Sequence, residues 1–146
     1  MAPNAAEQPE DHRRPEGASD EAVEAAGKMT EALETLERAR GHLYSFHQLI
    51  GEADAYLDRV LELLRACGET ELEEHVRTDL LGRNVAPGRW TFQLVEEFED
   101  GYWEVFRTHE RAVRKALVGG RRHVYEAEMK ERRRTHGRPG HESRPH

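Results

Sequence analysis

The stretch MTEALETLERARGHLYSFHQLIGEADAYLDRVLELLRAC, residues 29–67, decides the fold. Counting in sevens from its first residue meets only apolar side chains: Met29, Leu36, Leu43, Ile50, Leu57 and Leu64. The positions three residues later are apolar as well: Ala32, Ala39, Phe46, Ala53, Val60 and Cys67. An apolar period of 3.5 residues sustained over this length is typical of helices that pack together with a slight supercoil. We therefore predict one long helix over about residues 28–67.

With Met29 at heptad position a, these two sets occupy positions a and d. Further apolar residues at positions g and e (Leu49, Tyr56, Leu63 and Leu61) widen the apolar face, which favours a bundle over a two-stranded coil. We expect Cys67, at a d position, to be a small buried hydrophobic residue. The sequence leaves open whether the helix bends at Gly51.

A short helix is predicted over residues 71–81, because Thr70 and Glu73 have the spacing of a capping box. Its apolar face would be formed by Leu72, Val76 and Leu80. A loop follows, and a second long helix is predicted over about residues 90–118 with these inward positions: Val95, Phe98, Tyr102, Val105, His109, Ala112 and Ala116. The fold class is all-α, an antiparallel helical hairpin or small bundle.

Composition divides the 146-residue chain into three parts. Residues 1–19 are predicted to be a disordered acidic segment, and residues 20–120 a single helical domain. Residues 121–146 carry eight basic and four acidic side chains, and we expect a basic extension that is helical to about residue 134 and then disordered. Residues 28–81 carry six basic and twelve acidic side chains, so the body is acidic.

No motif for catalysis is visible, and we name no catalytic or cofactor-binding residue. Di-metal carboxylate bundles use Glu-x-x-His pairs, and none of the nine histidines has a glutamate three residues before it. The glycine-rich phosphate-binding motifs are missing too. The protein is expected not to be an enzyme and to need no cofactor.

A mononuclear metal or small-ligand site is one alternative. His47 and Asp54 lie beside the apolar positions of the first helix, in a polar column that begins with Arg40. They are seven residues apart, about 10.5 Å along a helix. A shared divalent metal ion would therefore need a third ligand from the second long helix, and His109 is the only obvious inward one. The competing interpretation is that these groups form hydrogen bonds at the edge of the bundle.

Two sets of residues are candidates for partner binding. Trp90 lies on the predicted loop, and Trp103 falls at an outward heptad position, so both could contact another protein. The basic extension could bind nucleic acid or an acidic partner through these arginines: Arg121, Arg122, Arg132, Arg133 and Arg134. Glutamates interrupt that run, and the acidic body opposes binding of a polyanion.

Three segments, HLYSFHQLIGEAD, GRNVAPGRWTFQLVEEFEDGYW and GGRRHVYEAEMKERRRTHGRPGHE, resemble a family of small actinobacterial proteins with no known activity. The resemblance spans roughly residues 29–142 and implies a cytoplasmic protein. It supplies no site residue.

The leading hypothesis is a non-enzymatic helical interaction protein that forms a homodimer or binds another helical protein. The reason is that the heptad face is long, and the remaining apolar sequence is too short to cover it. No secretory signal or membrane span is visible, so a cytoplasmic location is expected.

Overall fold

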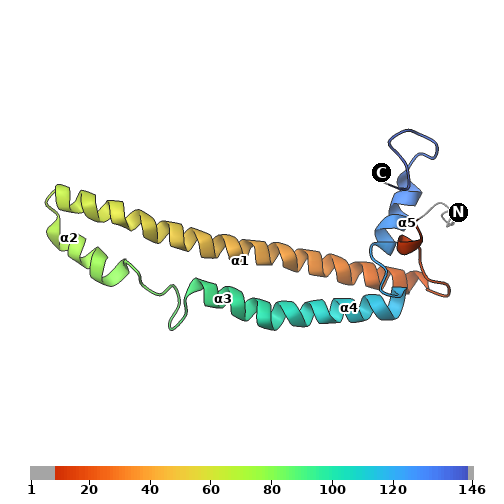
Figure 1. Cartoon of the computed structure of the whole chain (residues 1–146), viewed down its shortest axis with the longest axis horizontal. Helices are drawn as coiled ribbons and strands as arrows, with labels where there is room; N and C mark the ends of the chain where they lie inside the picture. Colours follow the sequence, from red (N-terminus) through yellow and green to blue (C-terminus); the bar gives the residue numbers. More distant parts are fainter. Residues whose placement is uncertain (1–8, 145–146) are drawn as a thin grey trace. The chain divides into compact units, whose positions relative to one another are not determined.

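The computed structural model describes residues 9–144, and these residues form helices joined by turns. The elements are, in order, a short 3-10 helix η2 (Glu10–His12), α1 (Asp20–Ala66), α2 (Thr70–His75), the π-helical turn η3 (Val76–Leu80), α3 (Thr91–Phe98), the π-helical turn η4 (Glu99–Trp103), α4 (Glu104–Val118) and α5 (Val124–Arg133) (Figure 1). No strand occurs among the described residues; an isolated β-bridge joins Ala86 and Arg89. The predicted all-α class is confirmed.

Helix α1 is continuous over 47 residues and begins earlier than residue 28. The Ser19 hydroxyl accepts a hydrogen bond from the Ala22 N–H at 3.1 Å, so Ser19 caps the first turn. The helix passes through Gly27, Gly41 and Gly51 without a break. It ends before Gly68, whose φ of +83° lies in the left-handed region that terminates helices.

The second helical segment differs in detail from the prediction. Glu69 precedes the first residue, and the predicted capping box of Thr70 and Glu73 does not form. The Glu73 carboxylate is instead buried, where it accepts hydrogen bonds from the guanidinium groups of Arg65 and Arg77. Leu72 and Leu80, predicted to be inward, are 51% and 49% exposed. The apolar face is therefore only partly covered.

The second long helix is interrupted by the π-helical turn η4. A π-helical turn inserts one extra residue into a helix, so the face that follows is shifted by one position. The inward residues after η4 are accordingly not the predicted ones but their successors: Trp103, Phe106, Glu110, Val113 and Leu117. The predicted residues Tyr102, Val105, His109, Ala112 and Ala116 are exposed. The inward positions predicted from the sequence are therefore wrong by one residue for the part of the helix after Glu99.

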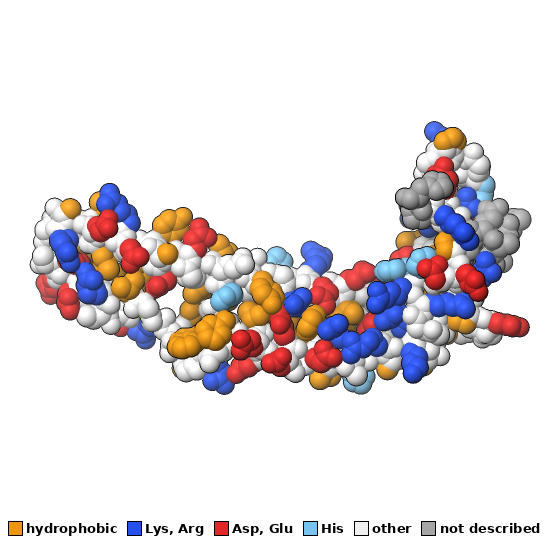
Figure 2. Space-filling view, in the orientation of Figure 1, with side chains coloured by type: hydrophobic (Ala, Val, Ile, Leu, Met, Phe, Trp, Pro, Cys, Tyr) orange, Lys and Arg blue, Asp and Glu red, His pale blue; other side chains and the backbone are white. Residues whose placement is uncertain are grey.

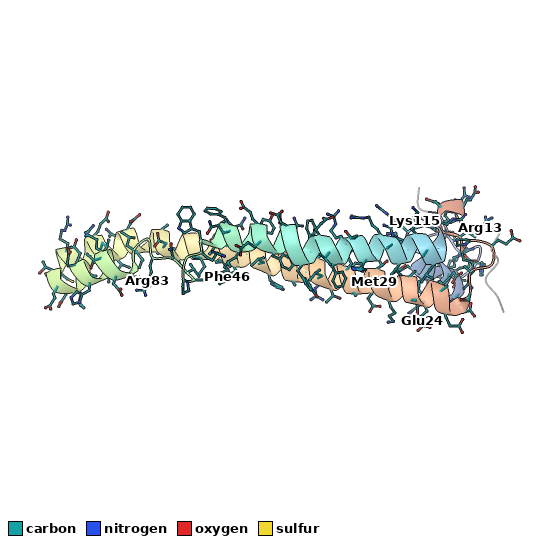
Figure 3. All side chains as sticks on the ribbon, turned by 90° about the horizontal axis from the view of Figure 1, so that it is seen from below. Arg13, Glu24, Met29, Phe46, Arg83 and Lys115 are labelled. Atoms are coloured by element: carbon teal, nitrogen blue, oxygen red, sulfur yellow. The ribbon has the colours of Figure 1, made fainter. Side chains whose placement is uncertain are left out.

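The described residues fall into two compact units. Unit 1 contains residues 9–36 and 104–144, and unit 2 is Glu37–Trp103. This division does not follow the predicted boundaries at residues 20 and 120, because residues 9–19 and 121–144 belong to unit 1 together with parts of α1 and α4. In Figure 3, Arg13, Glu24, Met29 and Lys115 mark unit 1, while Phe46 and Arg83 mark unit 2.

The apolar core of unit 1 is small and lies where α1, α4 and α5 meet. Its buried members are Val23, Ala26, Val118 and Val124. Tyr125 lies directly over Gly27: a Cβ atom at Gly27 would come within 2.8 Å of the Tyr125 Cβ atom. The glycine is therefore needed here for close approach of α5 to α1.

The disorder predicted for the N-terminal end does not extend through residues 9–19. The Arg14 guanidinium makes two hydrogen bonds, of 2.6 and 2.9 Å, to the buried carboxylate of Glu128 on α5, and a third of 2.7 Å to Asp20. The Arg121 guanidinium donates to the carbonyl oxygen of Arg13. These polar contacts hold the segment on unit 1. Residues 1–8, also part of that prediction, lie outside the described residues.

The C-terminal end shows the same behaviour. The buried Glu131 carboxylate accepts hydrogen bonds from Arg134 at 2.6 and 3.0 Å and lies 2.6 Å from the His136 ring. The Arg134 guanidinium also donates to the carbonyl oxygen of His141. Residues 135–144, predicted to be disordered, therefore fold back on α5. Residues 145–146 lie outside the described residues.

Candidate interaction surface

Unit 2 is an antiparallel hairpin of α1 and the returning chain. Hydrogen bonds between side chains or to the backbone join the two legs. As the residue number in α1 rises, the residue number of its partner falls, as expected for an antiparallel pair: Glu37 with Trp103, Arg40 with Glu99, His47 with Thr91, Asp54 with Gly82 and Arg65 with Glu73. The fully buried apolar residues of this unit are Leu61 and Val95. Its apolar core is thin for a chain segment of this length.

The heptad of α1 is divided between two faces. Every a position is at least half-buried against the returning chain, together with these e positions: Leu33, Arg40, His47, Asp54 and Leu61. Every d position is exposed, from Ala32 to Cys67. The a and d positions therefore do not form the single buried stripe that the sequence predicts, and Cys67 is exposed instead of buried.

From Phe46 onward, the d and g positions of α1, continued by Cys67 directly after the helix, form a continuous exposed stripe, here called the open face: Phe46, Leu49, Ala53, Tyr56, Val60, Leu63 and Cys67. Their spacing alternates strictly between three and four residues. Tyr56 is 67% exposed, Leu49 59% and Leu63 50%. This is the spacing that packs a helix against another helix, on a surface that nothing in unit 2 covers.

Exposed apolar side chains are concentrated in unit 2. Among residues 9–144, all of the exposed large hydrophobic residues except Val105 and Met129 belong to it. Figure 2 shows hydrophobic side chains at the surface over α2, α3 and the second half of α1. Contiguous apolar surface of this kind marks interaction sites in soluble proteins.

A groove whose volume lies in the usual range of ligand pockets, about 300–1,000 Å³, adjoins the open face. Its volume is about 530 Å³, and it lies between α1 and the loop that precedes α3. The apolar residues that line it are Ile50, Ala53, Leu57, Leu80, Val85 and Trp90. Since Ala53 belongs to both, the groove and the open face form one apolar surface.

The predicted polar column connects the two legs of unit 2. The Arg40 guanidinium lies 4.1 Å from the Trp103 ring centroid and donates to Glu99 at 3.0 and 3.2 Å. Hydrogen bonds from Tyr44 and then Arg40 lower the pKa of Glu99, while burial partly opposes them. Glu99 is therefore a stable anion that holds α1 and η4 together.

His47 and Asp54 fill similar roles. The His47 Nδ1 atom is 2.7 Å from the Thr91 hydroxyl at the first residue of α3. The Asp54 carboxylate accepts the Gly82 N–H at 2.9 Å, at the point where the loop begins. His109, the third residue of the predicted metal site, lies on α4 in unit 1, apart from His47 and Asp54 in unit 2. The register shift at η4 leaves its side chain exposed. Residues 9–144 contain no group of three or more His, Cys, Asp or Glu side chains arranged to hold a metal ion.

The two tryptophans, both predicted to be available for partner contact, differ in their exposure. Trp103, predicted to be an outward contact, is half-buried, and its indole N–H donates to Glu37 at 2.6 Å. The π-helical turn η4 is the reason, since it moves position 103 to the inner face. Trp90 is 56% exposed, with its ring centroid 5.1 Å from that of Phe92, and it lines the groove.

The arginines predicted to bind nucleic acid also differ in their surroundings: some are used in contacts within unit 1 and others are exposed. Arg121 and Arg134 are used inside unit 1, in the contacts with Arg13 and Glu131 described above. Arg122, Arg132 and Arg133 are exposed. The basic surface of the extension is thus smaller than the sequence suggests.

Comparisons of the chain with protein-family models, with curated proteins and with solved structures give no match. Among the described residues, no helix has the length and apolar character needed to cross a membrane.

Sequence reasoning missed the open face as a separate surface. The signal was present, since Leu49, Tyr56 and Leu63 already widen the apolar face at g positions. Treating heptad positions d and g, rather than a and d, as one apolar stripe would have identified the open face.

Proposed function

We propose that this protein is a non-enzymatic helical interaction protein that forms a homodimer through the open face of α1. The observation that carries the proposal is the strict three-and-four spacing of exposed apolar residues from Phe46 to Cys67. A helix that packs on one side only has no need of a second apolar stripe. A helix with two such stripes is typical of a bundle in which it has two helical neighbours.

A second copy of the chain is a suitable partner because one copy leaves its apolar surface in unit 2 open. Two hairpins that share this face would form a four-helix arrangement with both stripes of α1 covered. Aromatic and aliphatic anchors such as Tyr56 and Leu49 are the residue types that dominate the centres of protein interfaces.

The test is the molar mass of variants in sedimentation equilibrium at micromolar concentration. The unmodified chain is expected at twice 16.8 kDa. The double variant Leu49→Glu/Leu63→Glu is expected to be monomeric, because it places a carboxylate in each half of the open face. Circular dichroism should show that its helix content is retained, since both side chains are exposed in the single chain.

Leu72→Glu is the matched control. Leu72 is 51% exposed, almost the same as Leu63 at 50%, and also belongs to unit 2, but it lies on α2 and not on the open face. This variant should remain dimeric. A monomeric unmodified chain, or equal loss of the dimer in the Leu72 control, would contradict the proposal.

A further inference from the structure

We infer that the second copy packs antiparallel against the open face, in the one register that places Ala53 of each copy opposite Tyr56 of the other. This inference rests on the proposed function and adds the direction and alignment of the partner helix. It follows from three features of α1: the sizes of the side chains on the open face, the charges along one edge of it, and the groove along the other edge.

The first feature is the match of side-chain sizes. In an antiparallel pair of helices, residues on the open face of one copy meet those of the other in reverse order. In the proposed register, the small Ala53 lies opposite the large Tyr56 of the other copy. In the next layer of side chains on each side, Leu49 of one copy lies opposite Val60 of the other. Small against large is the arrangement that fills the space between two helices without voids.

The second feature is charge. Along the edge of the open face away from the groove stand Ser45, Glu52, Arg59 and Ala66. An antiparallel pair brings the same edge of both copies together, and in this register Glu52 of each copy lies beside Arg59 of the other. A shift of one heptad would instead bring the two Arg59 side chains together or, in the opposite direction, the two Glu52 side chains. A parallel pair would set this edge against the apolar edge that contains Ile50 and Leu57.

Both charges are available for this contact. Arg59 is paired within its own chain with Glu62 at 2.9 Å, but both side chains are highly exposed, at 70% and 66%. Exposed pairs of this kind contribute little to stability and exchange readily. The Glu52 carboxylate is exposed and accepts a weak hydrogen bond of 3.4 Å from Tyr56.

The third feature is the groove. Ile50 and Leu57 line it and are half-buried. In the antiparallel register Ile50 of one copy lies beside Leu57 of the other, so the two grooves meet at the twofold axis. Each groove, which Trp90 also lines, is completed by the second copy.

The chain contains its own probe for the register. Cys67 is the single cysteine, is exposed, and lies on the open face. In the proposed register Cys67 faces His42 of the second copy. His42 is exposed and occupies the g position directly before Phe46, the first residue of the open face. The two Cys67 side chains are then about 37 Å apart along the helix axis, far beyond the reach of a disulfide bond.

The experiment compares disulfide formation in three chains under mild oxidation: the unmodified chain, His42→Cys and Leu49→Cys. We expect a covalent dimer in His42→Cys, through a bond to Cys67 of the other copy, at least tenfold more than in the other two. Covalent dimer in the unmodified chain would indicate parallel packing. Covalent dimer in Leu49→Cys but not in His42→Cys would indicate the register shifted by one heptad. Either result would overturn the inference while leaving the homodimer in place.

A charge exchange gives an independent readout. Glu52→Arg and Arg59→Glu should each weaken the dimer about tenfold, because each creates two like-charge contacts in the symmetric pair. The double variant Glu52→Arg/Arg59→Glu should recover to within about threefold of the unmodified chain, since opposite charges meet again. Failure of the double variant to recover would contradict the register. Absence of any dimer by sedimentation would instead contradict the proposed function itself.

Discussion

At the scale of single residues, Gly27 shows that a helical glycine can be required for packing. Alanine is favoured over glycine in a helix by about 1 kcal/mol, so the presence of glycine at position 27, within α1, needs a reason. The reason is Tyr125, whose Cβ and Cγ atoms would lie 2.8 and 2.9 Å from a Cβ at position 27. Gly41 and Gly51 have open space around them.

Gly27→Ala is therefore expected to lower the free energy of unfolding by about 1–2 kcal/mol, because overpacking outweighs helix propensity. Gly41→Ala and Gly51→Ala are the controls and should raise it by up to about 1 kcal/mol. Urea denaturation of the three variants measures the difference. Equal stabilisation by all three substitutions would contradict the contact between Tyr125 and α1.

The buried Glu131 carboxylate makes unit 1 sensitive to acid. Hydrogen bonds from Arg134 and then His136 lower its pKa, although burial opposes this. A carboxylate whose pKa is lower in the folded than in the unfolded state stabilises the fold above the unfolded value of about 4.3. That stabilisation is lost as the pH falls through the lower pKa of the folded state.

Glu131→Gln is expected to lower stability at pH 7 and to make the loss of stability between about pH 4 and pH 2 less steep. The measurement is urea denaturation at several pH values. Glu126→Gln on the same helix is the control and should keep the steepness of the unmodified chain. If Glu131→Gln leaves the pH dependence unchanged, the ion pair with Arg134 does not contribute to folding.

At the scale of elements, the π-helical turn η4 sets which face of α4 is buried. It brings Trp103 and Glu110 inward and leaves His109 exposed. Because η4 amounts to one extra residue, its removal should restore a regular α-helix with the same residues facing inward.

Deletion of Gly101 is therefore expected to change the free energy of unfolding by no more than about 1 kcal/mol. Deletion of Ala112, an exposed residue within α4, should cost about 3 kcal/mol or more, since it rotates Val113, Leu117 and Val118 away from their buried positions. Thermal unfolding followed by circular dichroism compares the two deletions. Similar losses in both would contradict the account of the register.

The elements themselves could be predicted from the sequence, but the faces that they bury could not. Apolar periodicity located α1, the second helical segment and the second long helix. It could not reveal η4, because one extra residue within a charged stretch such as Glu99-Asp100-Gly101 leaves no mark on a helical pattern. Once the phase was lost there, Trp103 and His109 were assigned to the wrong faces.

Contacts between polar residues distant in sequence were equally hidden. Arg14 and Glu128 are 114 positions apart, and nothing in an acidic, proline-containing segment indicates that it will pack. The polar column was visible as a pattern, and hydrogen bonding was the correct competing interpretation for His47 and Asp54. Which backbone or hydroxyl group each would meet depended on where α3 begins.

At the scale of the whole molecule, the central claim is that the open face of α1 is covered by a second copy. Its most direct test is hydroxyl-radical labelling of two tyrosines as a function of protein concentration. Tyr56 is 67% exposed and Tyr102 is 61% exposed, so both should react similarly in a dilute single chain. Only Tyr56 lies on the open face. We predict that labelling of Tyr56 falls as the concentration rises through the dimer dissociation constant, while labelling of Tyr102 stays constant. Equal labelling of both tyrosines at every concentration would contradict the account.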